Sequence, residues 1–126
     1  MILGIGIDVV QVSRMEQWVD RQGLLERYFH PQELQTALSR GHSMVLSLAA
    51  RFAAKEAFGK ALGIGLRDVQ LRDIEVRNNG VGKPELVLHG RAREWLHYFG
   101  GQSVFLSMTH EVDNAIAVVI IEGERL

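Results

Sequence analysis

Cysteine is absent from this chain of 126 residues, which excludes several kinds of site at once. Without thiols there is no disulfide framework, no thiolate-bound zinc or iron–sulfur cluster, and no cysteine nucleophile. Proline occurs only at Pro31 and Pro84, and no Ser/Pro-rich linker, repeat or low-complexity run divides the chain. The sequence therefore predicts a single domain over residues 1–126.

A charge excess of either sign is also missing. Lys and Arg number 14 and Asp and Glu 15, for a formal net charge of −1, so a basic nucleic-acid-binding protein is not expected. No stretch reaches the roughly 18 apolar residues of a membrane span. The N-terminal residues 1–8 lack the basic segment of a signal peptide. We therefore expect a cytoplasmic protein that binds neither a membrane nor nucleic acid.

The hydrophobic pattern predicts an α+β fold in which helices flank a mostly antiparallel sheet. Ser13, followed by Glu16, has the pattern of a capping box at the start of a helix. The Ala-rich stretch 44–62 is the strongest helix, and Gly63 suits its C-terminal end. The expected order is β-α-α-α-β-β-α-β-β: a strand at 2–7, helices at 13–23, 31–40 and 44–62, a hairpin of 72–77 and 85–88 turning at Asn79-Gly80, a helix at 91–99, and a hairpin of 104–110 and 115–121.

Two carboxylates are the leading candidates for chemistry. Asp8 ends a hydrophobic strand, where it is either a turn residue or a metal ligand or general base. Glu56 lies on the long helix with mostly apolar or small neighbours one turn away, so we expect it to face a half-buried surface. Glu56 either forms an ion pair with Lys60 or shares a hard cation such as Mg²⁺ with Asp8.

Other residues suit an anionic ligand, each with an ordinary alternative. Arg51 and Lys55 share one helix face, which either contacts an anionic substrate or is a solvated charged edge. Gly63 and Gly65 either place backbone N–H groups around a phosphate or cap the helix. His110, at the end of a predicted strand, either binds phosphate or is an ordinary turn residue.

The first predicted helix carries a basic stripe. Arg14 and Arg21 are seven residues apart and share a face, with Trp18 near them. Basic residues around an exposed aromatic suit an acidic protein partner. The alternative is that Trp18 packs in the core and the arginines are solvated.

Taken together, these segments resemble the motifs of one family, the holo-acyl-carrier-protein synthases, which are small phosphopantetheinyl transferases. Residues 4–8 (Gly-Ile-Gly-Ile-Asp), with Arg14 six residues on, resemble the family's first motif. Residues 51–60 (Arg-Phe-Ala-Ala-Lys-Glu-Ala-Phe-Gly-Lys) resemble its second motif, F-x-x-K-E-A-x-x-K, at every defining position. Residues 82–84 (Gly-Lys-Pro) and 107–110 (Ser-Met-Thr-His) are similar to its later motifs, so the resemblance covers the chain from end to end.

The resemblance implies the family's fold and a transfer reaction of fatty acid biosynthesis. Phosphopantetheine would pass from coenzyme A to a serine of apo acyl carrier protein and leave 3′,5′-ADP. By resemblance, Asp8 and Glu56 hold Mg²⁺ with the diphosphate, and Lys60 lies near the leaving phosphate. The proton of the serine would go to Glu56 or to a metal-bound water, an alternative that the sequence leaves open. The residues implied to contact coenzyme A are Arg51, Gly63, Gly65, Lys83, Pro84 and His110.

The resemblance also implies partners. The family forms homotrimers with active sites between subunits, so Asp8, Glu56 and Lys60 would come from one chain and His110 from its neighbour. The acidic carrier protein would dock on the first helix. The residues implied for docking are Arg14, Arg21 and Trp18, with apolar help from Met15 and Leu25.

Two other functions stay open at this point. The same two carboxylates could serve a metal-dependent pyrophosphatase that cleaves coenzyme A-like diphosphates with water and needs no carrier protein. Alternatively, the chain could be a trimeric binding module whose Glu56 and Lys60 form only an ion pair.

Overall fold

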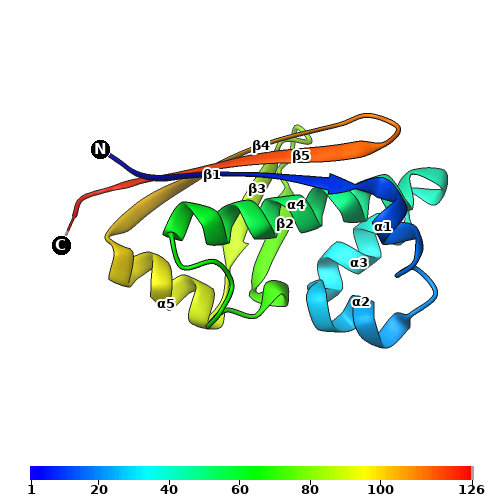
Figure 1. Ribbon diagram of the computed structural model, residues 1–126, viewed down its shortest axis with the longest axis horizontal. Helices are drawn as coiled ribbons and strands as arrows, with labels where there is room; N and C mark the ends of the chain where they lie inside the picture. Colours follow the sequence, from blue (N-terminus) through cyan, green and yellow to red (C-terminus); the bar gives the residue numbers. More distant parts are fainter. Residues whose placement is uncertain (126) are drawn as a thin grey trace.

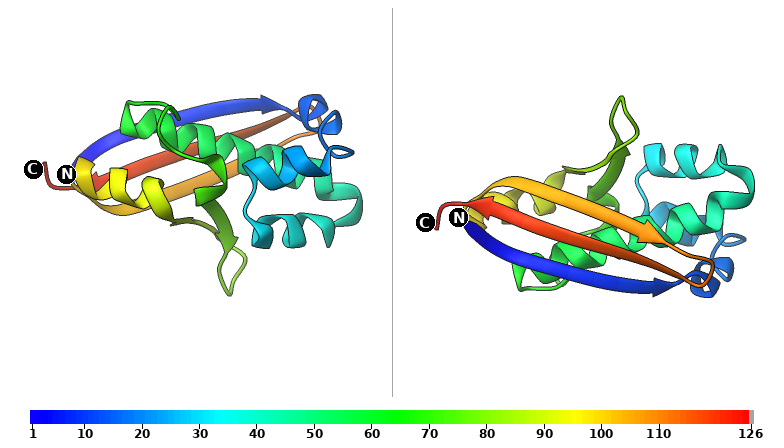
Figure 2. Two further views of the ribbon diagram at one scale, coloured as in Figure 1. Left: turned by 90° about the horizontal axis from the view of Figure 1, so that it is seen from below. Right: turned by 90° about the horizontal axis from the view of Figure 1, so that it is seen from above.

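The computed structural model describes residues 1–125, apart from the side chain of Gln22. A three-stranded antiparallel sheet in the order β1-β5-β4 lies on one side of the long helix α4, and the shorter helices α2, α3 and α5 lie on the other (Figure 1). A separate β2–β3 hairpin runs beside α4 (Figure 2). The elements are β1 (Ile2–Gln11), α1 (Val12–Glu16), α2 (Gln22–Tyr28), α3 (Pro31–Leu38), the 3₁₀ turn η1 (Gly41–Ser43), α4 (Met44–Leu62), the 3₁₀ turn η2 (Leu71–Asp73), β2 (Ile74–Asn78), β3 (Pro84–Leu88), α5 (Gly90–Phe99), β4 (Gly101–His110) and β5 (Asn114–Gly123).

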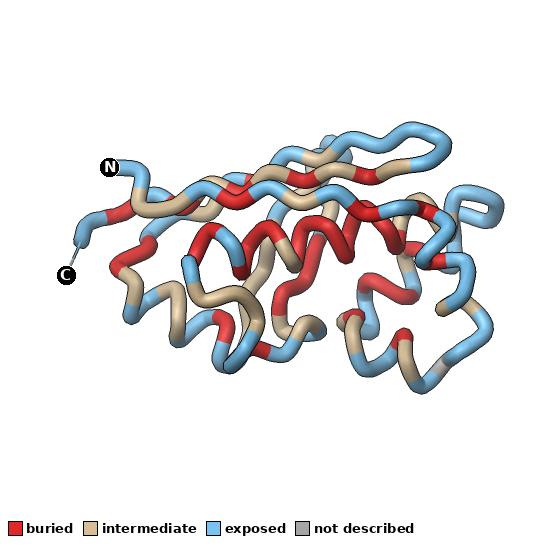
Figure 3. Tube along the Cα trace, viewed as in Figure 1, coloured by how far each residue is buried: buried red, intermediate tan, exposed pale blue. Residues whose placement is uncertain are grey.

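Helix α4 is the centre of the core. Most of its 19 residues are buried, as expected of a helix that is apolar around its whole circumference (Figure 3). Two glycines let β1 lie directly on the helix backbone. A Cβ atom added at Gly4 would lie 2.0 Å from the carbonyl oxygen of Ala61, and one at Gly6 would lie 1.9 Å from that of Ala57. The Gly-x-Gly sequence of the first strand is therefore a packing feature, and the strand is held closely over α4.

The outer face of the three-stranded sheet is apolar and no other described element covers it, as the view from above shows (Figure 2, right). Ile5, Ile7 and Val9 of β1 are each more than half exposed, and Phe105 of β4 is half exposed. In register with them, β5 places Ile120, Val118 and Ile116 on the same face. The face that meets α4 instead carries buried Ala115, Ala117, Val119 and Ile121.

Several expectations are confirmed. Helix α4 runs from Met44 to Leu62, and Gly63 caps it with φ of 82°. The strand pairs β2–β3 and β4–β5 are antiparallel hairpins, as the turn signals indicated. The β2–β3 loop is longer than a two-residue turn, because residues 79–83 close through a bond from the Asn79 N–H to the Lys83 carbonyl oxygen at 2.8 Å.

The predicted helix 13–23 is wrong as a single element. Helix α1 ends at Glu16 and α2 begins at Gln22, which adds one helix to the expected order. The bend between them lets Met15 and Leu25 both reach the core, where they are 0% and 2% exposed. The capping box at Ser13 is also wrong, since the N-cap residue is Gln11 and has no side-chain cap bond. A capping box occurs instead at the start of α3, between His30 and Glu33. Within residues 1–125, no helix is both long and apolar enough to cross a membrane.

Candidate functional site

Asp8 and Lys60 meet where β1 crosses the last turn and a half of α4. The Lys60 Nζ donates to Asp8 Oδ1 at 2.9 Å and to the carbonyl oxygen of Ile7 at 3.0 Å. The Asp8 side chain is only 16% exposed, whereas that of Lys60 is 54% exposed. Asp8 is therefore held at the base of the site, and the ammonium group of Lys60 lies at its solvent edge.

Glu56 lies one helical turn before Lys60 and is half-buried. Burial raises the pKa of its carboxyl group, and the nearby Asp8 carboxylate raises it further, while Arg14 and Lys60 act in the opposite direction. The Glu56 side chain makes no hydrogen bond or ion pair within residues 1–125. The interpretation of Glu56 and Lys60 as an i,i+4 ion pair is therefore wrong, because the ammonium group goes to Asp8 instead.

The chemistry of this pair fits a hard divalent cation. The Asp8 carboxylate raises the pKa of the half-buried Glu56, so two negative charges at this point are unfavourable neighbours. A divalent cation with oxygen preference removes that repulsion, and Mg²⁺ is commonly held by one or two carboxylates together with substrate phosphates. Asp8 and Glu56 are the residues that could hold it.

Helix α1 borders the site. The Arg14 guanidinium lies over the ring of Phe52, 5.2 Å from its centroid, and 5.8 Å from that of Trp18. Trp18 is half-buried and meets Phe52 edge to face at 5.2 Å, so its ring is neither free on the surface nor wholly in the core. Arg21 is exposed at the start of α2.

The predicted apolar docking contacts of Met15 and Leu25 are wrong, because both side chains lie in the core.

Arg51 and Lys55 face away from the Asp8 site. The Arg51 guanidinium is buried and donates to the carbonyl oxygen of Val76 at 2.6 Å and to Asn78 Oδ1 at 3.1 Å. Lys55 is fully buried and pairs with Glu33 at 2.6 Å. Burial lowers the pKa of both cations. The interpretation of a solvated charged edge is therefore wrong, since both cations are buried.

The other predicted contacts to coenzyme A lie apart from Asp8. Gly63 and Gly65 follow the C-terminus of α4, and their N–H groups already donate to the carbonyl oxygens of Lys60 and Gly59. Lys83 and Pro84 lie at the β2–β3 turn, and exposed His110 ends β4, two strands away from β1. Within one chain, Asp8, Glu56 and Lys60 come together, with Arg14 at their edge.

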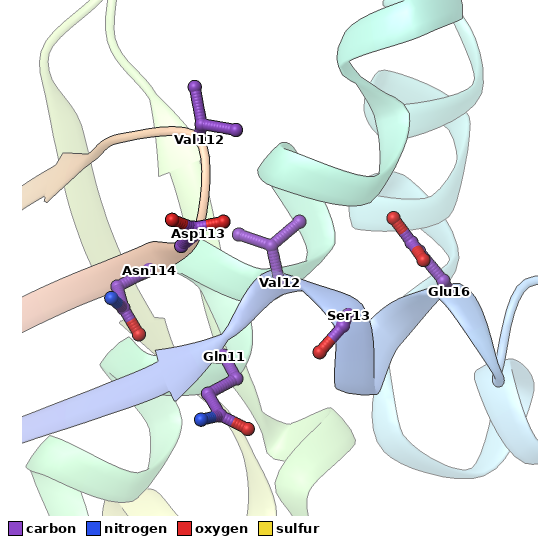
Figure 4. A pocket seen from close by; sticks show the side chains of 7 residues that line it. All are labelled: Gln11, Val12, Ser13, Glu16, Val112, Asp113 and Asn114. Atoms are coloured by element: carbon purple, nitrogen blue, oxygen red, sulfur yellow. The ribbon is translucent and has the colours of Figure 1, made fainter.

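A polar hollow of about 350 Å³ lies beside α1 rather than at the carboxylates. Figure 4 shows it where β1 passes into α1, next to the turn between β4 and β5. The N–H of Val12 donates to the carbonyl oxygen of Asp113 at 2.9 Å and so joins α1 to that turn. None of the predicted site residues lines this hollow. It shows, however, that α1 and the turn following His110 are neighbours in the fold.

Sequence reasoning missed two acidic residues, Glu33 and Glu75, that are buried on the far side of α4 from the sheet. Glu33 accepts from Lys55 and from the N–H of Val76, and Glu75 is buried although it lies between Ile74 and Val76 in the pattern. Alternation along β2 would place Glu75 on the solvent side. The first three residues of β2 are all buried, so alternation of polar and apolar residues does not tell which side of the strand Glu75 faces.

The comparisons with known proteins cover almost the whole chain. Residues 4–119 match the family model described as the 4′-phosphopantetheinyl transferase superfamily. A protein named holo-[acyl-carrier-protein] synthase from Treponema denticola is 55% identical over 123 residues, with 98% of this chain and 100% of that protein covered. One of the same name from Treponema pallidum is 49% identical over 126 residues, with 100% of both covered.

Solved structures of proteins with the same name have a similar fold. The holo-[acyl-carrier-protein] synthase from Neisseria meningitidis has a TM-score of 0.89 and 39% identity, covering 97% of this chain and 99% of that one. The holo-(acyl-carrier-protein) synthase from Bacillus anthracis, in complex with CoA (3′,5′-ADP), has a TM-score of 0.82 and 36% identity. The match covers 98% of this chain and 99% of that one. The α+β fold with its antiparallel sheet and flanking helices is thus confirmed.

Proposed function

Because the chain belongs to the holo-[acyl-carrier-protein] synthases of the 4′-phosphopantetheinyl transferase superfamily, we propose that it transfers phosphopantetheine from coenzyme A to a serine of apo acyl carrier protein, with Mg²⁺ as cofactor and 3′,5′-ADP as the second product. The observation that carries the proposal is the convergence of Asp8, Glu56 and Lys60 at one point between β1 and α4. A related structure bound to CoA (3′,5′-ADP) supports the choice of donor.

In this reaction the serine oxygen attacks the phosphorus next to the pantetheine arm. The bond from that phosphorus to the bridging oxygen breaks, and the electron pair leaves with 3′,5′-ADP. Asp8 and Glu56 would hold Mg²⁺, which would supply charge neutralisation for the diphosphate. Lys60 Nζ donates to Asp8 and to the Ile7 carbonyl oxygen, and its third N–H would donate to the leaving phosphate. The serine proton would pass to Glu56 or to a water molecule at this site.

The remaining predicted contacts to coenzyme A would complete the site from a neighbouring subunit. His110 cannot reach Asp8 across the sheet of its own chain, because β5 lies between β4 and β1. The uncovered apolar face of that sheet supports burial against other copies. We therefore include a homotrimer in the proposal, with Asp8, Glu56 and Lys60 on one chain and His110 on the next. Lys83, Pro84 and the Gly63–Gly65 loop would complete the nucleotide site. Arg51 would support the nucleotide site indirectly, because its guanidinium holds the side chain of Asn78 at the end of β2.

Carrier docking is proposed for the exposed side of α1 and the start of α2. Arg14 and Arg21 are exposed, and Arg14 lies within the electrostatic reach of Glu56. An acidic carrier that binds there would present its serine beside the carboxylates. Trp18 would contribute through its exposed edge, since its other side packs on Phe52.

The test is intact mass spectrometry of an apo acyl carrier protein incubated with this protein, coenzyme A and Mg²⁺, with an EDTA control. We expect the carrier to gain one phosphopantetheine, and the gain to disappear with EDTA. Asp8→Ala and Glu56→Ala should each abolish the transfer while the trimer persists on size-exclusion chromatography. Full activity of either variant with Mg²⁺ would show that the metal assignment is wrong.

Two controls separate the alternatives. Release of 3′,5′-ADP in the absence of any carrier protein would indicate a pyrophosphatase. If neither product forms with several carriers, thermal unfolding with and without coenzyme A then reports whether the chain binds it at all.

A further inference from the structure

A second cluster of metal-ligating side chains lies on the side of α4 away from the three-stranded sheet. It combines His30 before α3, Glu75 on β2 and His89 before α5, three elements that lie below α4 in Figure 1. One ligand atom from each residue lies within 4.8 Å of the other two. Glu75 Oε1 is 2.9 Å from His89 Nε2 and 3.8 Å from His30 Nδ1. This cluster takes no part in the reaction proposed above.

We propose that His30, Glu75 and His89 bind a divalent transition-metal ion, zinc in particular, at a site separate from the Asp8–Glu56 pair. Two imidazoles and one carboxylate are a ligand set that suits zinc, cobalt, nickel or copper, whereas Mg²⁺ prefers oxygen ligands alone. Such a set leaves further positions for water or another ligand.

Glu75 lies at the buried end of the cluster, and the two histidines lie at its solvent-exposed end. Glu75 is 1% exposed, and its carboxylate is held in place by hydrogen bonds with Arg77 and His89. The histidine side chains are 26% and 38% exposed, so an ion can enter from solvent between them.

Three rearrangements accompany binding. His30 Nδ1 must release the N–H of Gln32, from which it accepts at 3.2 Å as the N-cap of α3. The rings of His30 and His89 are stacked, 5.0 Å apart and tilted by 16°, and a metal must lie close to the plane of each ring that binds it. Both rings must therefore rotate toward a common point. Arg77 must also release Glu75, to which it donates at 3.1 and 3.2 Å. Its side chain is 56% exposed, so it can move into solvent. Arg77 is thus a competitor for the metal.

Binding would connect three separate parts of the fold. His30 is the N-cap of α3 and His89 that of α5, and Glu75 lies in the hairpin strand between them in the sequence. A shared ion would cross-link these elements and raise the stability of the folded chain according to its affinity and concentration.

The test is zinc titration of the metal-free full-length protein against a chromophoric chelator, with no coenzyme A or carrier present. We expect one zinc per chain at this cluster, and a loss of about tenfold or more in affinity for His89→Ala and for His30→Asn. Asparagine keeps an N-cap acceptor at α3, so the second variant retains the helix start. Arg77→Gln should bind zinc more tightly than the unmodified chain. His97→Ala, on the exposed side of α5, is the matched control and should bind normally.

The outcomes distinguish this proposal from the proposed function. Asp8→Ala and Glu56→Ala should lose transfer yet keep the zinc affinity of this cluster. Among the five histidines, only the imidazole NMR signals of His30 and His89 should shift with one equivalent of zinc. Zinc affinity that depends on Asp8 or Glu56 instead, or that is unchanged in a His30→Asn/His89→Ala double variant, would overturn the proposal.

Discussion

Lys60 on α4 donates a 2.9 Å hydrogen bond to Asp8 on β1, across 52 positions of sequence. This contact joins the strand that carries one carboxylate to the helix that carries the other. Lys55, five residues earlier on the same helix, makes its own 2.6 Å ion pair with Glu33 in the core. The two lysines of one motif therefore have different tasks, one at the site and one beneath it.

Substitution of each lysine by methionine should separate these tasks. Lys60→Met is expected to lower the transfer rate by about two orders of magnitude. It should change stability by less than about 1 kcal/mol, because the Lys60 side chain is 54% exposed and water can replace its ammonium group beside Asp8. Lys55→Met should destabilise the fold by about 3–5 kcal/mol, because it leaves the Glu33 carboxylate buried without its cation. Denaturant unfolding and the transfer rate measure the two effects. Unchanged stability of Lys55→Met would show that the Lys55–Glu33 ion pair does not hold the fold together.

Gly6→Ala should displace β1 from α4. The added Cβ would lie 1.9 Å from the carbonyl oxygen of Ala57, and neither backbone segment can move away without opening the core. We expect a loss of about 3 kcal/mol or more together with weaker transfer, since Asp8 follows two residues later. Gly80→Ala is the control, because no atom lies within 4 Å of its added Cβ and its φ is not left-handed. Equal melting temperatures of the two variants would contradict the close strand–helix contact.

Glu56→Gln should stabilise the metal-free protein at neutral pH. The pKa of Glu56 is raised in the folded state, so the folded chain holds this proton more tightly than the unfolded chain. Stability therefore falls as pH rises from the ordinary glutamate pKa through the raised one, and the glutamine variant escapes this loss. The gain should be less than about 1 kcal/mol, because the group is only partly buried.

Thermal unfolding in EDTA across this pH range measures the effect. The difference between the two proteins should vanish at pH values below the ordinary pKa of glutamate. Added Mg²⁺ should stabilise only the unmodified chain. A glutamine variant that is less stable at neutral pH would mean that Glu56 has a stabilising partner.

Ile7→Glu should prevent assembly. Ile7 is 56% exposed on the uncovered sheet face, next to Val118 in the register, and a carboxylate there could not be buried against another copy. Light scattering should report a monomer with native circular dichroism and no transfer activity. Leu38→Glu, on the exposed side of α3, should keep the assembly. A fully active monomer would show that the site is complete within one chain.

Arg21→Ala should weaken carrier docking without affecting coenzyme A. Removal of an exposed positive charge at a docking surface slows the association of the two proteins. We expect KM for the carrier to rise about tenfold. KM for coenzyme A should stay unchanged, and added salt should reduce the difference between the variant and the unmodified chain. Arg93→Ala on α5 is the matched control. An equal effect of both variants would point to long-range charge rather than docking.

Much of the fold followed from local signals. The helix 44–62, its glycine cap and the two hairpins could be predicted because propensity, capping and turn chemistry act over a few residues. The break between α1 and α2 could not, because it depends on Met15 and Leu25 both reaching one core from different directions. Ser13 and Glu16 had the right spacing for a capping box, but the chain enters that helix from β1 with Gln11 as N-cap.

The sequence by itself determined the candidate chemistry, because the residue types at positions 8, 56 and 60 and their motif spacing are properties of the chain alone. Only the tertiary structure decided which charges serve the site. Lys60 pairs with Asp8 rather than Glu56, and Arg51 and Lys55 are buried in a polar network with β2 and Glu33. It also brought His30, Glu75 and His89 together from three separate segments. The reason is physical: a charge takes the partner that compensates its loss of water, and burial is set by the packing of distant elements rather than by neighbours in sequence.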